Sequence, residues 1–256
     1  MKILTIVAHP DDETMLTGGT LALLQKTGAD MFYLCATRGE GGDIGEPPVS
    51  TRDRLGEIRE DEFNKAVTAL GGGQIGFLDY IDPLVGNEQK LFPYTDKIDD
   101  LVKKILQFIK KIHPDVVITH GVNGEYGHPG HILTHKAVSS AVSNIKVDGL
   151  LLYSFCADFP NHPSPRHANP DNPAHVILDV SSVMDQKINA AYSHRSQIAL
   201  FLRRQSRNAG YTLTVPEVLM KVESLHRVLP IVHGTPDDIL VHALQPWIIT
   251  SELSFT

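Results

Sequence analysis

The sequence predicts an α/β protein with a mostly parallel β-sheet and helices on both faces of that sheet. Short apolar runs typical of buried strands alternate along the chain with longer segments of helical periodicity. Consecutive parallel strands need crossover helices between them, so this order is the signature of such a sheet. In addition, two polar clusters rich in histidine and acidic residues directly follow strand-like runs, where sheets of this class bind ligands.

The alternation can be followed over most of the chain. Strands are expected over 2–8, 31–37, 74–79, 116–119, 149–155 and 176–178, and helices over 14–26, 55–70, 96–111, 132–142, 183–193 and 197–204. The 96–111 helix is strongly amphipathic, and Pro114 follows its end. We expect a single domain over residues 1–256, with a motif-bearing core over 1–200 and a C-terminal extension over 201–256.

Residues 158–174 stand apart from this pattern. They contain five of the sixteen prolines and show no helical or strand periodicity. A structureless loop of this length is uncommon in a compact domain and often has a function. Two interpretations remain open, a lid over a binding site and a plain surface connection.

Composition narrows the class of protein. A hydrophobic content of 42% in 256 residues supplies a substantial core, and the net charge of −7 argues against a general binder of nucleic acid or anionic membranes. Only Cys35 and Cys156 are present, so no disulfide framework is expected. No run approaches the roughly 20 apolar residues of a membrane span, and residues 3–7 are too short for a signal-peptide core. We therefore expect a cytoplasmic protein, and a homo-oligomer is compatible with the sequence.

The first polar cluster, residues 9–13 (His-Pro-Asp-Asp-Glu), directly follows the first strand. Imidazole and carboxylate together suit Zn²⁺ and similar divalent ions. His9 and Asp12 lie three residues apart at a strand-to-helix turn, so we expect them to face one point. His131, in residues 128–131 (His-Pro-Gly-His), is the natural third ligand because it also follows a strand-like run. Two histidines and one aspartate leave a position open for water, as in catalytic zinc sites.

Asp11 is then the uncoordinated carboxylate, placed to take a proton from a water at the metal. Glu13 is expected to support the site or to favour the helix start, because acidic residues stabilise helix N-termini. The alternative is that residues 9–13 form only a helix cap with an acidic first turn. That alternative leaves a half-buried histidine unexplained.

Two further histidines have weaker signals. His120 follows the 116–119 strand and could approach the site, but as a lone histidine it is expected to be a hydrogen-bonded structural residue. His194 follows a predicted helix, and its sequence position leaves open whether it faces the pocket or the surface.

Five short motifs follow one another in the first 200 residues. They are residues 8–13 (Ala-His-Pro-Asp-Asp-Glu), 37–41 (Thr-Arg-Gly-Glu-Gly), the helical pattern of 59–71, 126–131 (Tyr-Gly-His-Pro-Gly-His) and 194–197 (His-Arg-Ser-Gln). Together they resemble the LmbE-like, or PIG-L, family of zinc-dependent N-deacetylases. The resemblance implies a Rossmann-like α/β fold and hydrolysis of an N-acetyl group, usually on an N-acetylglucosamine derivative.

The resemblance also implies roles for residues of the first cluster and its partner. His9, Asp12 and His131 match the zinc ligands of the family, which implies one Zn²⁺ per chain. Other divalent metals also fit a site of two histidines and one aspartate. Asp11 matches the general base.

The remaining roles come from outside the metal ligands. His128 matches a histidine that, as an imidazolium, stabilises the oxyanion or protonates the leaving amine, and Tyr126 matches a tyrosine near the oxyanion. Arg59 and Asp82 match substrate-binding residues. Gly130 departs from the family, which usually has His-Pro-Asp-His here. Without that carboxylate, the protonation state of His128 is open, or another acid compensates.

The sequence thus predicts a metal-dependent hydrolase that cleaves the N-acetyl amide of an amino-sugar conjugate by water attack. Two alternatives remain open. One is a zinc amidase acting on another N-acyl or thiol conjugate. The other is a non-catalytic, metal-dependent sugar-binding protein on the same fold.

Overall fold

The computed structural model describes residues 1–145 and 147–249. Its main sheet has seven strands in the order β3-β2-β1-β4-β5-β9-β8, and a second sheet pairs β6 with β7. The strands are β1 (Lys2–Val7), β2 (Asp30–Thr37), β3 (Gln74–Tyr80), β4 (Val116–Thr119), β5 (Leu151–Phe155), β6 (Ala157–Asp158), β7 (Asn169–Pro173), β8 (Val176–Asp179) and β9 (Val222–Leu229).

The first five strands are parallel, which confirms the predicted class of fold. β1 pairs with β2 and β4, β2 with β3, and β4 with β5, all in parallel. The chain therefore builds outward in one direction from β1 and then in the other, so a topological switch point lies between β1 and β4. Sheets of this kind bind ligands beyond the carboxyl ends of their strands at that point.

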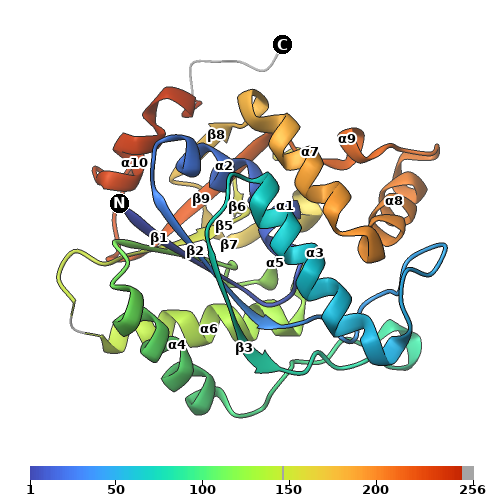
Figure 1. Cartoon of the computed structure of the whole chain (residues 1–256). Helices are drawn as coiled ribbons and strands as arrows, with labels where there is room; N and C mark the ends of the chain where they lie inside the picture. The colour runs from blue at the N-terminus through green and yellow to red at the C-terminus, as the bar shows by residue number, and fades with distance from the viewer. Residues whose placement is uncertain (146, 250–256) are drawn as a thin grey trace.

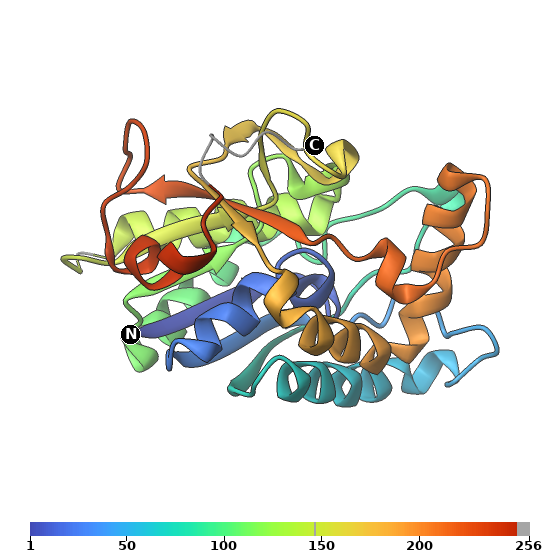
Figure 2. The same cartoon turned by 90° about the horizontal axis from the view of Figure 1, so that it is seen from above.

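Helices cover both faces of the sheet (Figures 1 and 2). They are α1 (Asp12–Met15), α2 (Gly18–Lys26), α3 (Leu55–Ala69), α4 (Ile98–Ile112), α5 (Gly124–Gly127), α6 (Pro129–Asn144), α7 (Met184–Ser193), α8 (Arg195–Ala209), α9 (Val215–Val218) and α10 (Ile239–Leu244). α4 and α6 pack on one face, and α2, α3 and α7 pack on the other. In β1, Ile3 and Val7 join one core while Leu4 and Ile6 join the other, because successive side chains of a strand point to opposite faces.

The segment after residue 200 supplies part of the main sheet. β9 runs antiparallel to β5 on one side and to β8 on the other. A strand from the expected C-terminal extension thus lies inside the sheet, a position that the sequence did not predict. The single domain over 1–256 stays a prediction, and residues 146 and 250–256 lie outside the described part.

The predicted helix over 14–26 is broken into α1 and α2. The buried Glu223 carboxylate is the reason, because it accepts hydrogen bonds from the backbone N–H groups of Gly19 and Thr20 at 2.8 and 2.7 Å. Those groups would otherwise need partners in a preceding turn of helix. Glu223 also pairs with the buried Lys187 at 2.6 Å, so β9, α2 and α7 are joined at one point.

Within the described residues, no helix is both long enough and apolar enough to cross a membrane.

Gly19→Ala is expected to lower the free energy of unfolding by about 1–3 kcal/mol through overpacking. A Cβ at position 19 would lie 2.5 Å from the Cβ of the fully buried Val180. Gly18→Ala is the matched control, because a Cβ there meets Lys187 Cγ at an ordinary 3.4 Å. The control should shift stability by less than about 1 kcal/mol. Urea unfolding measures both variants, and equal losses would refute the close approach of α2 to Val180.

Candidate active site

The two polar clusters of the sequence meet beyond the carboxyl ends of β1 and β4. β1 leads into His9 and Asp12, and β4 leads through α5 to His131 near the start of α6. Asp12 Oδ1 lies 3.2 Å from His131 Nε2, and Asp12 Oδ2 lies 3.3 Å from His9 Nδ1. All three side chains are buried. The three predicted metal ligands therefore lie together at the switch point.

The candidate ligand atoms form two overlapping groups. His9, His128 and His131 offer one set of atoms within 4.8 Å of one another, and Asp12, His120 and His131 offer a second. His131 belongs to both groups. The predicted set of His9, Asp12 and His131 spans the two, so the hydrogen bonds of each histidine decide which nitrogen atoms are free for a metal.

Both ring nitrogens of His120 are occupied. Its Nδ1 donates to Glu125 Oε2 at 2.9 Å, and its Nε2 accepts the backbone N–H of Ala8 at 3.0 Å. The ring is fully buried and stacks on His131 at 4.0 Å between centroids. The prediction of a hydrogen-bonded histidine is confirmed, and His120 also lies within the site, with its Nε2 3.4 Å from Asp12 Oδ2.

His131 has the properties of a metal ligand. Its Nδ1 donates to Glu125 Oε2 at 2.6 Å, which leaves the lone pair on Nε2. That Nε2 is buried and has no hydrogen-bond partner among the described residues, a rare condition for a buried polar atom. Asp12 Oδ2 accepts the backbone N–H of His9 at 2.9 Å, a hydrogen bond that favours the ionised form of this carboxylate. An ionised carboxylate beside a free imidazole lone pair fits a zinc-like cation.

Asp11 has a strained backbone. Its φ of 125° is a conformation that L-residues rarely adopt, at a cost of about 1–3 kcal/mol. Glu13 holds it there, because Glu13 Oε2 accepts the Asp11 N–H at 2.9 Å. The other Glu13 oxygen accepts from Thr14 Oγ1 at 2.6 Å and from His194 Nε2 at 2.8 Å. His194 is fully buried, so the surface interpretation of that residue is wrong.

The Asp11 carboxylate is supported by Arg59. The Arg59 Nη2 donates to Asp11 Oδ2 at 2.9 Å and to the carbonyl oxygen of Pro10, and its Nη1 donates to Gly39 O at 2.8 Å. Burial raises the pKa of Asp11 to about 6, although Arg59 lowers it. Such a pKa suits a general base near neutral pH. Because Arg59 is buried beneath Asp11, the structure shows a supporting contact, and its substrate-binding role stays a prediction.

Asp82 lies on the other side of His9. Its Oδ1 is 3.3 Å from His9 Nε2, so a carboxylate faces each ring nitrogen of that histidine. Burial lowers the pKa of His9, but Asp82 and Asp12 outweigh it and raise the pKa to about 9. The structure thus places Asp82 within the site, and its contact with substrate stays a prediction.

His128 is neutral in this arrangement. Its Nδ1 accepts the backbone N–H of Gly130 at 3.1 Å, so that nitrogen carries no proton. Burial, together with His131 and His9, lowers the pKa of His128 to about 2. A cation among these imidazoles would lower it further. The structure therefore favours a neutral ring that donates from Nε2 over the imidazolium that the resemblance implies.

Tyr126 lies at the rim of the site. Its ring centroid is 5.4 Å from that of His131 and 5.7 Å from that of His128, and the residue is 45% exposed. This position is open to a bound molecule on one side and to the imidazoles on the other. Its role near an oxyanion stays a prediction.

Position 130 leaves little room for the aspartate of the family pattern. A Cβ there would lie 3.2 Å from both His9 Cε1 and His128 Nδ1, closer than most such contacts. A buried carboxylate enters the site from Glu125 instead, which the sequence reasoning missed. Its signal was an acidic residue in the loop before the His128 motif, but no spacing rule shows that its backbone, at φ 58° and ψ −95°, turns the side chain inward.

Part of the 158–174 segment is fixed against the site. The buried Asn169, in β7, accepts the backbone N–H groups of Asn123 and Glu125 through Oδ1 at 3.1 Å each. Its Nδ2 donates to Glu125 Oε1 at 3.2 Å. Neither a free lid nor a plain surface connection describes this part of the segment.

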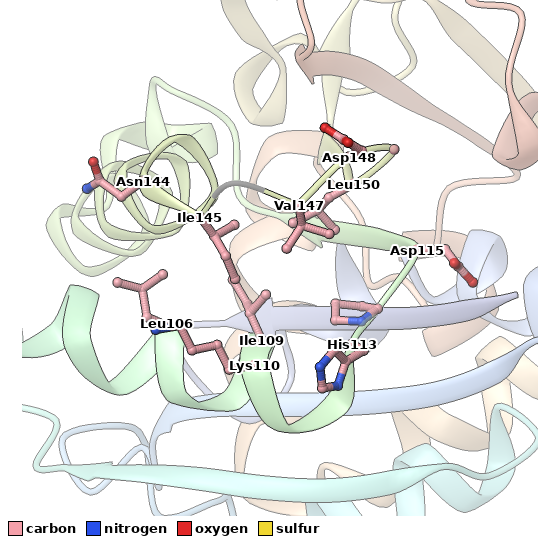
Figure 3. A pocket seen from close by; sticks show the side chains of 12 residues that line it. Leu106, Ile109, Lys110, His113, Asp115, Asn144, Ile145, Val147, Asp148 and Leu150 are labelled. Atoms are coloured by element: carbon pink, nitrogen blue, oxygen red, sulfur yellow. The ribbon is translucent and has the colours of Figure 1, made fainter.

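A separate cavity of about 660 Å³ lies at the amino ends of β4 and β5, opposite to the carboxyl ends where the histidines of the site lie (Figure 3). It is lined by the end of α4, including Ile109 and Lys110, by the end of α6, and by Asp115 and Leu150, which directly precede β4 and β5. Because it adjoins the amino ends of these strands, it is remote from the histidine cluster. None of the predicted site residues lines this cavity.

An α/β sheet with buried imidazoles and carboxylates at its switch point is the arrangement of a Rossmann-like enzyme with a candidate metal site. The PIG-L family model, described as GlcNAc-PI de-N-acetylase, matches residues 4–142, and the chain belongs to this family of N-deacetylases. A 1D-myo-inositol 2-acetamido-2-deoxy-alpha-D-glucopyranoside deacetylase of Rhodococcus opacus (strain B4) is 30% identical over 241 residues, which cover 78% of this chain and 82% of that protein. The family predicted from the motifs is confirmed.

Solved structures share the fold at lower identity. The N,N'-diacetylchitobiose deacetylase of Pyrococcus horikoshii has a TM-score of 0.63 at 23% identity, over 89% of this chain and 83% of that chain. The 4-carboxy-2-hydroxymuconate hydratase GalB of Pseudomonas putida KT2440 has a TM-score of 0.61 at 21% identity, over 92% and 99%. A deacetylase and a hydratase thus share this fold, so the fold alone does not define the reaction.

Arg59→Met is expected to lower the free energy of unfolding of the metal-free protein by about 3–5 kcal/mol at neutral pH, because it leaves the Asp11 carboxylate buried without its partner. The loss should shrink as the pH falls through the Asp11 pKa of about 6, since a neutral carboxyl needs no counter-charge. Arg54→Met is the matched control, because that side chain is 66% exposed. The control should change stability by less than about 0.5 kcal/mol. Equal losses in urea unfolding would contradict the supporting role of Arg59.

Proposed function

We propose that this protein is a zinc-dependent hydrolase that removes the N-acetyl group from an N-acetylglucosamine derivative. The observation that carries the proposal is the buried Nε2 of His131, which has no hydrogen-bond partner within residues 1–145 and 147–249 and lies beside the Asp12 carboxylate, in a chain of the PIG-L family. His9, Asp12 and His131 would hold one Zn²⁺ per chain. When bound, the cation would polarise the acetyl carbonyl and activate a water for attack.

Asp11 is the general base of this proposal. Its strained turn and its bond to Arg59 fix the carboxylate next to Asp12, and a pKa of about 6 leaves it ionised at neutral pH. It accepts the proton that the attacking water loses. An amine leaves poorly unless it is protonated, so this proton must reach the amide nitrogen before the C–N bond breaks. With His128 neutral, Asp11 is the group that holds a proton for that step.

His128 supports the other side of the reacting carbonyl. With Nδ1 engaged by Gly130, its proton lies on Nε2, and a neutral imidazole can donate that hydrogen to the developing oxyanion. The exposed Tyr126 at the rim is a second candidate donor. Preorganised donors of this kind act without reorganisation as charge develops.

The relative from Rhodococcus opacus supports an N-acetylglucosaminyl conjugate of a polyol as a first substrate to test. Arg59 and Asp82 are the candidate contacts to the sugar, with Asp82 being the one of the two that lies beside a ligand histidine. We also propose that the enzyme acts in the cytoplasm as one domain over residues 1–256, in line with the sequence.

The experiment that tests the function is acetate release from N-acetylglucosamine and a panel of its conjugates, with metal counted by elemental analysis. About one zinc per chain with chelator-sensitive acetate release is the expected result. Bound zinc without acetate from any conjugate would redirect the proposal to another acyl group or to a binding protein. A wild-type protein that holds no divalent metal would overturn the metal centre itself.

Asp11→Asn is expected to keep the metal and to lower kcat by about 10²–10⁴-fold, because the amide is isosteric but cannot accept the proton. Asp79→Asn is the matched control. Asp79, near the end of β3, also has a positive φ, but its side chain is 68% exposed. The control should keep wild-type turnover. Steady-state acetate assays on both variants decide the point, and full turnover in Asp11→Asn would remove the base assignment.

His131→Ala is expected to abolish stoichiometric zinc binding, because it removes a buried ring nitrogen that has no hydrogen-bond partner within the described part of the chain. His135→Ala serves as the control from the next turn of α6, where the buried ring donates from Nδ1 to the His120 carbonyl oxygen at 2.8 Å. It should keep about one zinc per chain. Elemental analysis after chelator-free purification compares the two, and full occupancy in His131→Ala would exclude His131 as a ligand.

A further inference from the structure

We propose that Glu125 is a positioning residue that fixes which nitrogen of His131 carries the proton, and thereby sets the affinity of the centre for its metal. The inference rests on the metal centre proposed above. It assigns to this chain a buried acidic residue that orients a proposed ligand histidine from position 125.

The Glu125 carboxylate accepts four hydrogen bonds, all from N–H donors. Oε2 accepts from His131 Nδ1 at 2.6 Å and from His120 Nδ1 at 2.9 Å. Oε1 accepts from the backbone N–H of Gly121 at 2.9 Å and from Asn169 Nδ2 at 3.2 Å. Only an ionised carboxylate offers acceptors on both oxygens to four donors at once.

The charge of Glu125 indicates a cation nearby. The residue is only 4% exposed, and among the described residues its ion-pair contacts are to the imidazoles of His120 and His131, with no lysine or arginine. A buried carboxylate without such a partner is costly. A divalent cation on the far nitrogen of His131 would offset that cost, as in the carboxylate–histidine–zinc arrangement of metalloenzymes.

The backbone of Glu125 has a strained conformation that directs its side chain toward the two histidines. Its φ of 58° with ψ of −95° is a strained conformation for a residue with a side chain. The N–H of Glu125 donates to Asn169 Oδ1 at 3.1 Å, and the same amide reaches back to the carboxylate. Strain of this kind persists only where the surroundings over-determine it.

Glutamine at position 125 could not replace the carboxylate. The NH₂ group of a glutamine would replace one of the two carboxylate oxygens. It would then face two N–H donors, either those of His120 and His131 or those of Gly121 and Asn169. The side of Gly121 and Asn169 is closed to it, because the backbone N–H must donate and the Asn169 Oδ1 is occupied by two other N–H groups. The NH₂ group would therefore face the imidazoles. His120 cannot respond, because its Nε2 accepts the Ala8 N–H, so His131 must move its proton to Nε2.

That proton would occupy the nitrogen that is free to bind a metal. The expected result of Glu125→Gln is a dissociation constant for Zn²⁺ about 10–100-fold higher than in the wild type, the usual effect of removing a partner of a ligand histidine. Competition with a chromophoric chelator measures this value without any activity assay. In the metal-free protein, at a pH high enough for the His131 ring to be neutral, ¹⁵N NMR of the histidine rings should show Nδ1–H for His131 in the wild type and Nε2–H in the variant.

Glu223→Gln is the matched control. Glu223 is an equally buried carboxylate that accepts from backbone groups and pairs with Lys187, and it makes no hydrogen bond or ion pair with a histidine of the described residues. It should lose stability while keeping wild-type zinc affinity and the wild-type His131 tautomer. A loss of affinity in Glu125→Gln that is no larger than in Glu223→Gln would overturn the inference, because both would then report only weakened folding.

Two further outcomes are decisive even where Glu125→Gln proves too unstable to purify. A wild-type, metal-free protein with the proton of His131 on Nε2 would overturn the inference, whereas Nδ1–H supports it.

Failure of the proposed function is a separate result. A wild type that binds no zinc removes the metal centre together with this inference, but a wild type that binds zinc while Glu125→Gln binds it equally well removes the inference alone.

Discussion

The carboxylate of Asp12 joins the two halves of the site. One oxygen accepts the backbone N–H of His9 at 2.9 Å and so closes the turn that follows β1, while the other faces His131 from the β4 side at 3.2 Å. This contact is possible only because β1 and β4 are parallel neighbours whose carboxyl ends coincide. The positions of Asp11 before it and Glu13 after it depend on the same turn. A substitution that moved either strand end would therefore disperse acid, base and ligands together.

Strain around this turn is balanced by buried hydrogen bonds rather than by packing. The positive φ of Asp11 is held by Glu13, and Glu13 is held in turn by His194 from the end of α7. The positive φ of Glu125 is held in the same way by Asn169 from β7. In both cases, a side chain from far along the chain completes a loop that its own sequence would not stabilise. Such strain concentrates at functional sites because a unique side-chain direction is needed there.

The sequence was sufficient for the parts of the fold that depend on local pattern. The parallel strands of 2–8 and 116–119, the amphipathic 96–111 helix and the meeting of His9, Asp12 and His131 all follow from periodicity and strand order. It was insufficient where long-range partners decide. The place of β9 depends on antiparallel pairing with β5 and β8, and the break between α1 and α2 depends on Glu223, some 200 residues away in the chain. The inward position of Glu125 was not predicted because it depends on Asn169, a partner from a distant part of the chain.

Position 130 lacks the aspartate of the family pattern, and the site instead contains the carboxylate of Glu125, which contacts a different histidine. An acid at 130 would adjoin His128, but Glu125 contacts His131 and His120, and among the described residues the hydrogen bond of His128 is to the Gly130 N–H. His128 then stays neutral, which limits it to donating a hydrogen bond. In the mechanism proposed above, the proton that the leaving amine needs comes from Asp11, so one carboxylate would serve as base and then as acid. Glu125 would then support the ligand side of the proposed metal centre, and both proton transfers would depend on a single residue.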